Sequence, residues 1–402
     1  MYFKNSAITT PPEVQVKKPL KLAEANIDVT ESSAIPSQYR SCLYLETTNR
    51  IMKDFKIPKS AEQVIPQLEN LLKSIFLLGL LIGSFALAQV GVAAIDTYFL
   101  SHPGPGYLIF KWAFVIGLAV FNCILLTGLA VMAHEAIHRV LFKSRFWNDM
   151  WGGILSSLAG MLPFYANRQF HLLHHRYTHH PGLDPEERLH NHSFWYAFFM
   201  GGLIGIYQHY KIVAINLFAF VLGEWSKGCQ GLKDVCFSGF AVAFYFFFIP
   251  MVGICPWYTV VPTLLLQPLG YSFRALCDHY AFAPAISHVA QKSFNQEADM
   301  EDESPTFLGQ QLAVNSWVIL TNPLLSWLWS NVNYHQVHHR YPYLSHRYLP
   351  EIFEAQQMKH EQSDAVVQGY FCCLMGLSKM QYYSSHEEVE SLLLKVSSGN
   401  AI

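Results

Sequence analysis

The sequence predicts an all-α, polytopic membrane protein, and three observations carry that prediction. Only 14% of its 402 residues are charged, whereas a soluble domain is usually about 25% charged. Several apolar stretches reach the roughly 20 residues that a helix needs to cross a bilayer. The basic residues and the histidine clusters fall on one side of these stretches. The net charge of −2 gives no reason to expect a nucleic-acid partner.

Four stretches are expected to cross the membrane as two tight helical hairpins. Residues 75–95 and 108–133 form the first pair, and the connection between them contains the turn "SHPGPGY". Residues 236–254 and 257–275 form the second pair, joined by the dipeptide "CP". Such short connections require the two helices of each pair to run antiparallel and side by side.

Two further apolar stretches are expected to lie at the membrane interface. They cover residues 147–165 and 193–223. The second contains "YQHYK" at its middle, and these polar groups would be costly at bilayer depth. We therefore place both stretches on the membrane surface rather than across it.

The distribution of basic residues predicts the orientation. Of 27 Lys and Arg residues, 26 lie on one side of the four spans, and Lys111 alone lies on the other. The positive-inside rule then puts both termini, the large loops and all histidine clusters in the cytoplasm. The expected parts are a cytosolic N-terminal tail with an amphipathic lead-in (1–74), a membrane domain (75–355) and a cytosolic C-terminal tail (356–402).

Three short motifs concentrate histidine and predict a metal site. They read HEAIH, HLLHH and HQVHH, and their histidines are His134, His138, His171, His174, His175, His335, His338 and His339. Residues three and four apart share a helix face, so the motifs can converge on a common centre. The alternative is a metal-capturing loop of a transporter. Such loops are irregular and repetitive, whereas these motifs lie in aromatic, apolar sequence.

Over roughly residues 75–355 the chain resembles the membrane fatty acid desaturase family. The resemblance rests on the order of the three motifs, on "NVNYHQVHHRYPYL" around the third, and on Asp184-Pro185-Glu186 after the second. It implies four transmembrane helices under a cytosolic helical cap that holds two irons. It also implies one more histidine after the fourth span, which is His279 here, and thus nine iron ligands.

The chain departs from the family pattern at two positions. Ala275 stands where some acyl-CoA desaturases have an asparagine that binds a bridging water, so that role is not carried over. His179 stands where the family often has asparagine. With nine ligands already assigned, we expect His179 and His180, together with His190 and His192, to lie outside the ligand set.

The nine histidines imply oxidative chemistry on lipid. Imidazole suits iron, and an iron pair with O2 can remove hydrogen from an unactivated C–H bond, which no side chain acid or base can do. Removal of a second hydrogen gives a double bond, whereas return of oxygen gives an alcohol. We therefore expect O2-dependent desaturation of a lipid acyl chain. The alternatives are a carotenoid or other lipid hydroxylase and, third, a metal transporter.

Groups around the irons and the electron source are also expected from the sequence. Glu135, Asp149, Asp184 and Asp278 are candidates to accept the second N–H of a bound histidine. The third motif begins with histidine rather than with the glutamine of front-end desaturases fused to cytochrome b5. Electrons are therefore expected from a separate donor, a ferredoxin or cytochrome b5. The remaining histidines are expected at the surface or in packing: His102, His209, His288, His346, His360 and His386.

Overall fold

The computed structural model describes residues 65–178, 183–190, 192–280, 316–358 and 366–378. The chain divides into two compact units. One unit holds residues 1–64 and 350–363, and only the part of helix α15 (Leu349–Met358) from Pro350 onward is described in it. The other unit holds the remaining residues, and everything below concerns that unit.

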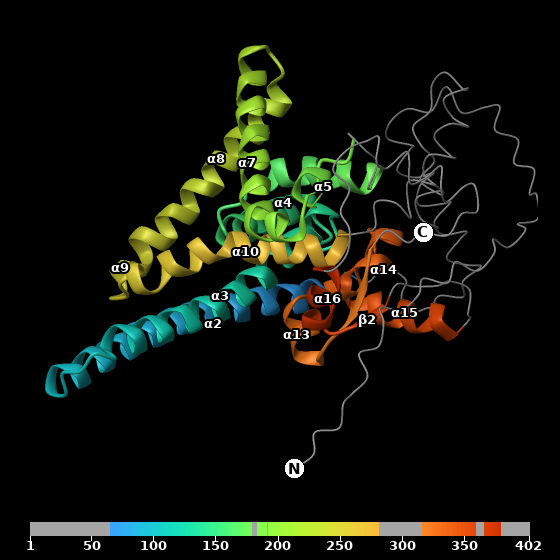
Figure 1. Ribbon diagram of the computed structural model, residues 1–402. Coiled ribbons are helices and arrows are strands. Elements are labelled where there is room, and N and C mark those ends of the chain that lie inside the picture. Colours follow the sequence, from blue (N-terminus) through green and yellow to red (C-terminus); the bar gives the residue numbers. More distant parts are fainter. Residues whose placement is uncertain (1–64, 179–182, 191, 281–315, 359–365, 379–402) are drawn as a thin grey trace, which may run out of the picture. The chain divides into compact units, whose positions relative to one another are not determined.

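Helices α2 (Gln67–Ser101) and α3 (Tyr107–Ile137) form a long antiparallel hairpin (Figure 1). Their facing sides are apolar: Leu77 and Leu81 of α2 are fully buried in one core cluster with Leu125 of α3. Each helix is long and apolar enough to cross a membrane. The hairpin contains the first two predicted spans. The two helices lie side by side because each buries an apolar stripe against the other.

A second antiparallel pair is formed by α7 (Phe194–Val221) and α8 (Trp225–Ala243). Helix α8 continues through a π-helical turn, η3 (Phe244–Phe248), into α9 (Ile249–Met251). Both α7 and the continuous helix from α8 to α9 are long and apolar enough to cross a membrane. In Figure 1 the α7–α8 end of this pair projects away from α2 and α3, whereas α9 returns toward their turn.

Helix α10 (Val260–His279) lies alongside α3. The Tyr258 ring just before it is 6.2 Å from the Trp112 ring near the start of α3. Farther along, the Asn122 amide donates to the Thr263 hydroxyl at 3.1 Å. Helix α10 therefore passes through the same layer as α3 and ends at the level of the histidine motifs.

The four spans predicted from the sequence and the four most apolar long helices differ in one member. Four helices among the described residues are long and apolar enough to cross a membrane. Helix α10, which contains residues 260–275 of the fourth predicted span, is not one of them, whereas α7 is. The physical reason lies in the polar residues of α10. Gln267 and Ser272 are buried by neighbouring helices rather than presented to lipid.

Shorter elements complete the part of the chain that holds the histidines. They are α4 (Arg145–Leu158), α5 (Phe164–Tyr177), α6 (Glu187–His190), η4 (Pro256–Tyr258), β1 (Val318–Leu320), α13 (Pro323–Leu328), η5 (Val332–Tyr334), α14 (His335–Arg340), η6 (His346–Tyr348), β2 (Val366–Gln368) and α16 (Tyr370–Leu377). Strands β1 and β2 pair in parallel, with Val318 opposite Val366. This two-stranded ribbon was not expected from the sequence.

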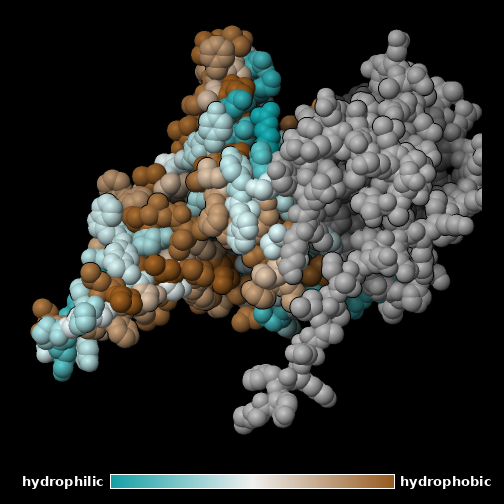
Figure 2. All heavy atoms as spheres, viewed as in Figure 1, coloured by the Kyte–Doolittle hydropathy of each residue, from teal (hydrophilic) through white to brown (hydrophobic). Residues whose placement is uncertain are grey.

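The exposed face of the long helices is largely hydrophobic. Figure 2 shows hydrophobic side chains, in brown, over much of the described surface. Ile109 on α3 and Leu265 on α10 are each 73% exposed, and Met251 at the end of α9 is 83% exposed. Exposed apolar surface on this scale is expected of a protein that contacts lipid.

Helices α7 and α10 approach each other closely at Gly202. A Cβ atom at this position would lie 1.9 Å from the carbonyl oxygen of Pro268 on α10. The Gly202 amide also donates to the Ser272 hydroxyl at 2.6 Å. Glycine is therefore required here for the crossing of the two helices.

We expect Gly202→Ala to destabilise the protein, because the new methyl group would force α7 away from α10. The expected loss is about 1–3 kcal/mol, the usual cost of overpacking. The measurement is the thermal unfolding temperature in detergent. Gly239→Ala on α8 is the control, since a Cβ there has nothing within 4 Å. Equal unfolding temperatures for Gly202→Ala and the wild type would contradict this account of the crossing.

Candidate metal centre

The nine histidines that were expected as ligands lie on or next to four helices and face one region. His134 lies in the last turn of α3 and His138 caps that helix. The second motif lies on α5, His279 is the last residue of α10, and the third motif forms most of α14. Seven of the nine are buried: His171, His174, His175, His279, His335, His338 and His339.

Five of these rings form one group, which we name the five-histidine cluster. It consists of His134, His138, His171, His175 and His338, and one ring nitrogen from each lies within 4.8 Å of the others. The Nε2 atom of His171 is at the middle. It is 2.8 Å from Nε2 of His134, 3.0 Å from Nε2 of His138 and 2.9 Å from Nε2 of His175.

The other four rings form a second group, the four-histidine cluster. Ring nitrogens of His174, His279 and His339 lie within 4.8 Å of one another. The Nε2 atom of His335 joins them, at 3.0 Å from Nε2 of His279 and 3.1 Å from Nε2 of His339. The structure thus brings together all nine residues and divides them into sets of five and four.

Each HxxHH motif contributes to both clusters. On α5, His171 and His175 are four residues apart and share one cluster, whereas His174 belongs to the other. On α14 the assignment is reversed: His335 and His339 share the four-histidine cluster, and His338 belongs to the five-histidine cluster. Positions i and i+4 lie on one face, so each helix presents two adjacent faces to two centres. The sequence predicted convergence but not this division.

The electrostatics of the clusters fit bound cations. Burial lowers the pKa of His138, His171 and His338 well below the ordinary value, and nearby histidines lower the pKa further. These rings are therefore neutral, which is the form that binds a metal. A neutral ring carries one N–H, so Nε2 atoms that face one another about 3 Å apart present lone pairs to a common point. Neutral nitrogen ligands of this kind suit iron.

One histidine of the four-histidine cluster is held by a carboxylate. The His174 ring presents Nδ1 to Asp184 Oδ1 at 2.9 Å, and both side chains are fully buried. Burial by itself would lower the pKa of His174, but the charges of Asp184 and Glu186 outweigh it and raise the pKa to about 9. Because Nδ1 donates to Asp184, Nε2 is turned toward His279 at 3.1 Å.

The other three acidic candidates contact different groups. Glu135 accepts from the backbone amide of His346 at 3.0 Å, and the His346 ring lies 3.1 Å from the same oxygen. Asp278 forms an ion pair with Arg274. Asp149 forms an ion pair with Arg168 at 2.7 Å. Of the four candidates, Asp184 is the one that lies at hydrogen-bond distance from a ring of the two clusters.

The sequence analysis missed one acidic residue near the clusters, and it left open whether His346 lies at the surface or in packing. Glu186 places its carboxylate oxygens 3.8 Å from His171 Nδ1 and 3.8 Å from His174 Nε2. Its place in "DPEE", two residues after Asp184, was the available signal. His346 was expected at the surface or in packing, and it is buried against Glu135.

The histidines expected outside the ligand set have mixed outcomes. His179, His180, His288, His360 and His386 lie outside the described residues, as does the side chain of His190. His102 is exposed at the end of α2. His209 is buried in α7, with Nδ1 2.6 Å from the carbonyl oxygen of Gly205.

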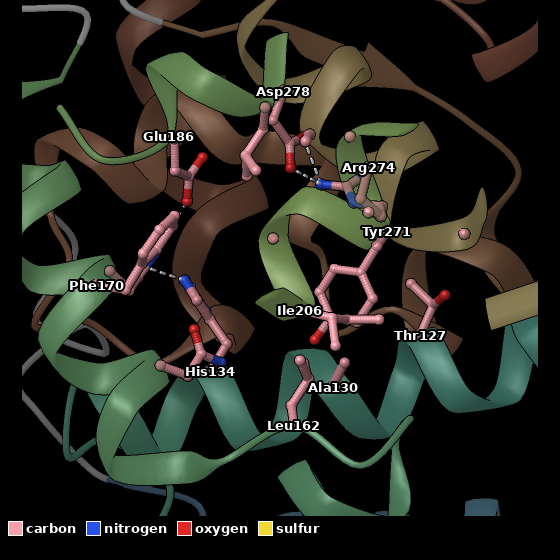
Figure 3. A pocket seen from close by; sticks show the side chains of 18 of the residues that line it. Thr127, Ala130, His134, Leu162, Phe170, Glu186, Ile206, Tyr271, Arg274 and Asp278 are labelled. Carbon is pink, nitrogen blue, oxygen red and sulfur yellow. Dashed lines mark hydrogen bonds and ion pairs between the residues drawn. The ribbon is translucent and has the colours of Figure 1, made fainter. Parts of the chain in front are cut away.

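A cavity of about 150 Å³ lies against both clusters. Its walls come from α3, α5, α7 and α10, and it contacts His134 and His171 of one cluster and His279 and His335 of the other. Figure 3 shows this space from close by, with Ile206 and Tyr271 between His134 and Thr127 in that view. A group bound in the cavity would therefore be near both candidate metal positions.

Comparison with known proteins agrees with this geometry. A family model described as fatty acid desaturase matches residues 110–368. An sn-1 linoleoyl-lipid 6-desaturase of Arthrospira platensis is 21% identical over 277 residues, which are 61% of this chain and 73% of that protein. A zeaxanthin 4-ketolase of Chlamydomonas reinhardtii is 28% identical over 145 residues, which are 33% of this chain and 32% of that protein.

We expect Asp184→Asn to weaken metal binding, because the carboxylate that fixes the His174 ring would be lost. Loss of such a partner usually costs 10–100-fold in metal affinity. The measurement is iron retained per chain after dialysis against chelators of increasing strength. Glu224→Gln, which breaks an exposed ion pair with Lys227 in the α7–α8 connection, is the control and should retain iron like the wild type. Unchanged retention in Asp184→Asn would contradict the role given to this carboxylate.

Proposed function

Because the chain belongs to the fatty acid desaturase family, we propose that this oxidoreductase introduces a double bond into a lipid acyl chain with iron and O2. The observation that carries the proposal is the pair of histidine clusters beside one cavity. Four helices separated in sequence supply these rings, and a packing role would not require nine ring nitrogens to converge.

We assign one iron to each cluster. His134, His138, His171, His175 and His338 would hold the first iron, and His174, His279, His335 and His339 would hold the second. Iron bound there, with O2, supplies the removal of hydrogen from an unactivated C–H bond. The chain itself positions the substrate. Rings of both clusters line the cavity, so an acyl chain in it would pass both ions, and placement within about 1 Å decides which C–H reacts.

Residues of the cavity wall would also limit access of water. Leu162 and Phe170 close one side, and Ile206 of α7 closes another. Gly201 and Gly205 leave room on α7, because any side chain there would point at the cavity or its walls. An apolar substrate enclosed by these residues is separated from bulk solvent while hydrogen is removed.

Oxygenation of a carotenoid or another lipid is the second candidate function. The specific observation in its favour is the polar part of the cavity lining, which includes Gln267, Thr127 and Asn167. An unsubstituted acyl chain has no polar group that could form a hydrogen bond with these side chains. The partial match to a zeaxanthin 4-ketolase points the same way. Desaturation stays first because the desaturase relative matches a larger share of the chain.

A metal transporter is disfavoured by the partners of the ionisable residues in the long helices. Asp234 on α8 accepts the backbone amides of Tyr165 and Ala166 at 2.8 and 2.9 Å. Lys111 on α3 pairs with Asp96 on α2 at 2.9 Å. Within the described ranges, groups of three or more candidate metal ligands occur in the two clusters alone. A transport path would need such groups at successive depths.

We further propose that both termini and the histidine clusters lie in the cytoplasm and that α7 lies at the interface. Lys111 Nζ lies 4.6 Å from the Tyr258 ring, so the connection before α10 is at the same end as the α2–α3 turn. The chain that leads from the second histidine motif to this connection must therefore cross the membrane once. Helix α8 with α9 supplies that crossing, and a second complete crossing by α7 would reverse the side.

We also propose where the acyl substrate and the electrons come from. The substrate would come from the bilayer that surrounds the long helices, and electrons would come from a separate ferredoxin or cytochrome b5. The exposed apolar residues of α2, α3 and α9 support the membrane location.

The reaction is tested by expression in a host with a simple lipid profile, followed by mass spectrometry of lipids and supplied carotenoids. We expect new double bonds in host acyl chains. His338→Ala and His339→Ala, one from each cluster, should lower bound iron and abolish the product. His102→Ala, an exposed histidine outside both clusters, should retain both. Unchanged acyl chains together with oxygenated carotenoids would replace desaturation by the second candidate.

The topology is tested by accessibility tags. Tags at residue 1, near residue 190 and at residue 402 should report the cytoplasm, whereas a tag near residue 104 should report the opposite side. Interfacial placement of α7 predicts that a tag at Gly223 reports the cytoplasm as well. Tags near 190 and at 402 on opposite faces would refute a shared metal centre on one side.

A further inference from the structure

One end of the cavity, remote from the histidines, is bounded by two oxygen atoms. A Cβ atom built on Gly270 of α10 would lie 3.7 Å from the amide oxygen of Gln267 and 3.7 Å from the hydroxyl oxygen of Thr127 on α3. All three residues line the cavity. The absence of a side chain at Gly270 therefore leaves a space that two polar atoms from different helices face.

Both oxygen atoms offer lone pairs rather than protons. The Thr127 hydroxyl donates its proton to the carbonyl oxygen of Cys123 at 2.8 Å, so its remaining capacity is to accept. Gln267 is 2% exposed, and its amide oxygen is buried without a hydrogen-bond partner. Buried acceptors are almost always satisfied in folded proteins. The group that completes this place is therefore a hydrogen-bond donor.

The residues between this place and the clusters define the shape of the ligand. Thr127 precedes His134 by seven residues on one continuous helix, which corresponds to about 10 Å of helix rise. Ala130 and Val131 line the cavity over that distance from α3, and Ile206 lines it from α7. Along α3 and α7 the ligand is thus apolar, and it carries a donor at about 10 Å from the metal centre. Charged residues that line the cavity, Glu186 and the ion pair of Arg274 with Asp278, contribute to its wall elsewhere.

We propose that Gln267, Thr127 and the space at Gly270 form a hydroxyl-binding subsite, and that the preferred substrate is a lipid with a hydroxyl group remote from the reacting carbon. The proposal rests on the function proposed above and specifies its substrate class. A hydroxyl donates to the free acceptors and needs no counter-charge, which agrees with the lack of an ionised side chain among these three residues. It would also fix the register of the chain, and hence which carbon lies beside the clusters.

The test is equilibrium binding to the full-length protein in nanodiscs. The probes are tritiated long-chain acyl methyl esters in matched pairs, with and without a hydroxyl on the terminal carbon, over a series of chain lengths. We expect the wild type to bind the hydroxylated ester about 2–10-fold more tightly at one optimal length, the range for one net hydrogen bond. No preference at any length would overturn the proposal and would mean that the subsite holds only water.

Three variants make the test specific. Gly270→Ala should abolish the preference by filling the space, and its methyl group would make ordinary contacts at 3.7 Å. Gln267→Leu should abolish the preference by removing the acceptor. Gly117→Ala on α3, where a Cβ has nothing within 4 Å, should keep it. An undiminished preference in both Gly270→Ala and Gln267→Leu would refute the assignment. If either variant does not fold, Thr127→Val provides the same comparison.

The hydroxyl preference and the desaturation reaction are measured separately, so either one can be refuted without the other. If expression gives no desaturated lipid while the hydroxyl preference and its loss in the variants are observed, the subsite stands and desaturation falls. If acyl chains are desaturated while no preference exists, desaturation stands and the subsite falls.

Discussion

The constraint on which the rest of the structure depends is the convergence of nine imidazole rings, seven of them on buried residues, whose nitrogens face one another. A neutral ring can donate one proton, so neighbouring Nε2 atoms about 3 Å apart cannot all be satisfied by each other. Buried polar atoms without partners cost about 1–3 kcal/mol each. Two cations would remove that cost in both clusters. Metal binding and the folding of the parts that carry His171 and His338 are therefore linked.

The long helices matter because they fix where the rings lie. Helices α3 and α10 run side by side and end with His134 and His279. Helix α5 is held by Asp234 of α8. The Asp234 carboxylate accepts the backbone amides of Tyr165 and Ala166 in the first turn of α5. The amide of Asn70 on α2 donates to the Leu141 carbonyl just after the first motif. Each ring position thus depends on a contact between elements far apart in sequence.

The sequence predicted the helices and the eight motif histidines that converge, because spacing of three and four residues reads directly as one helix face. The ninth, His279, came from the resemblance to the family. It did not predict how the rings divide. His174 and His175 are adjacent yet face different clusters, and only the approach of α10 to one side of α5 determines which. The contact between Glu135 and His346 joins positions 211 residues apart, and no local pattern marks such a pair.

The difference between the predicted spans and the four most apolar helices has its origin in residues of the cavity. Helix α10 falls short in apolarity because Gln267 and Arg274 are polar, and both residues line the cavity. A helix that lines a cavity with polar side chains has a lower average hydropathy, while its exposed face, as at Leu265, stays apolar. Average hydropathy therefore favours α7 over α10, the helix that supplies His279. The polar residues that lower the average of α10 are residues that line the cavity beside the histidine clusters.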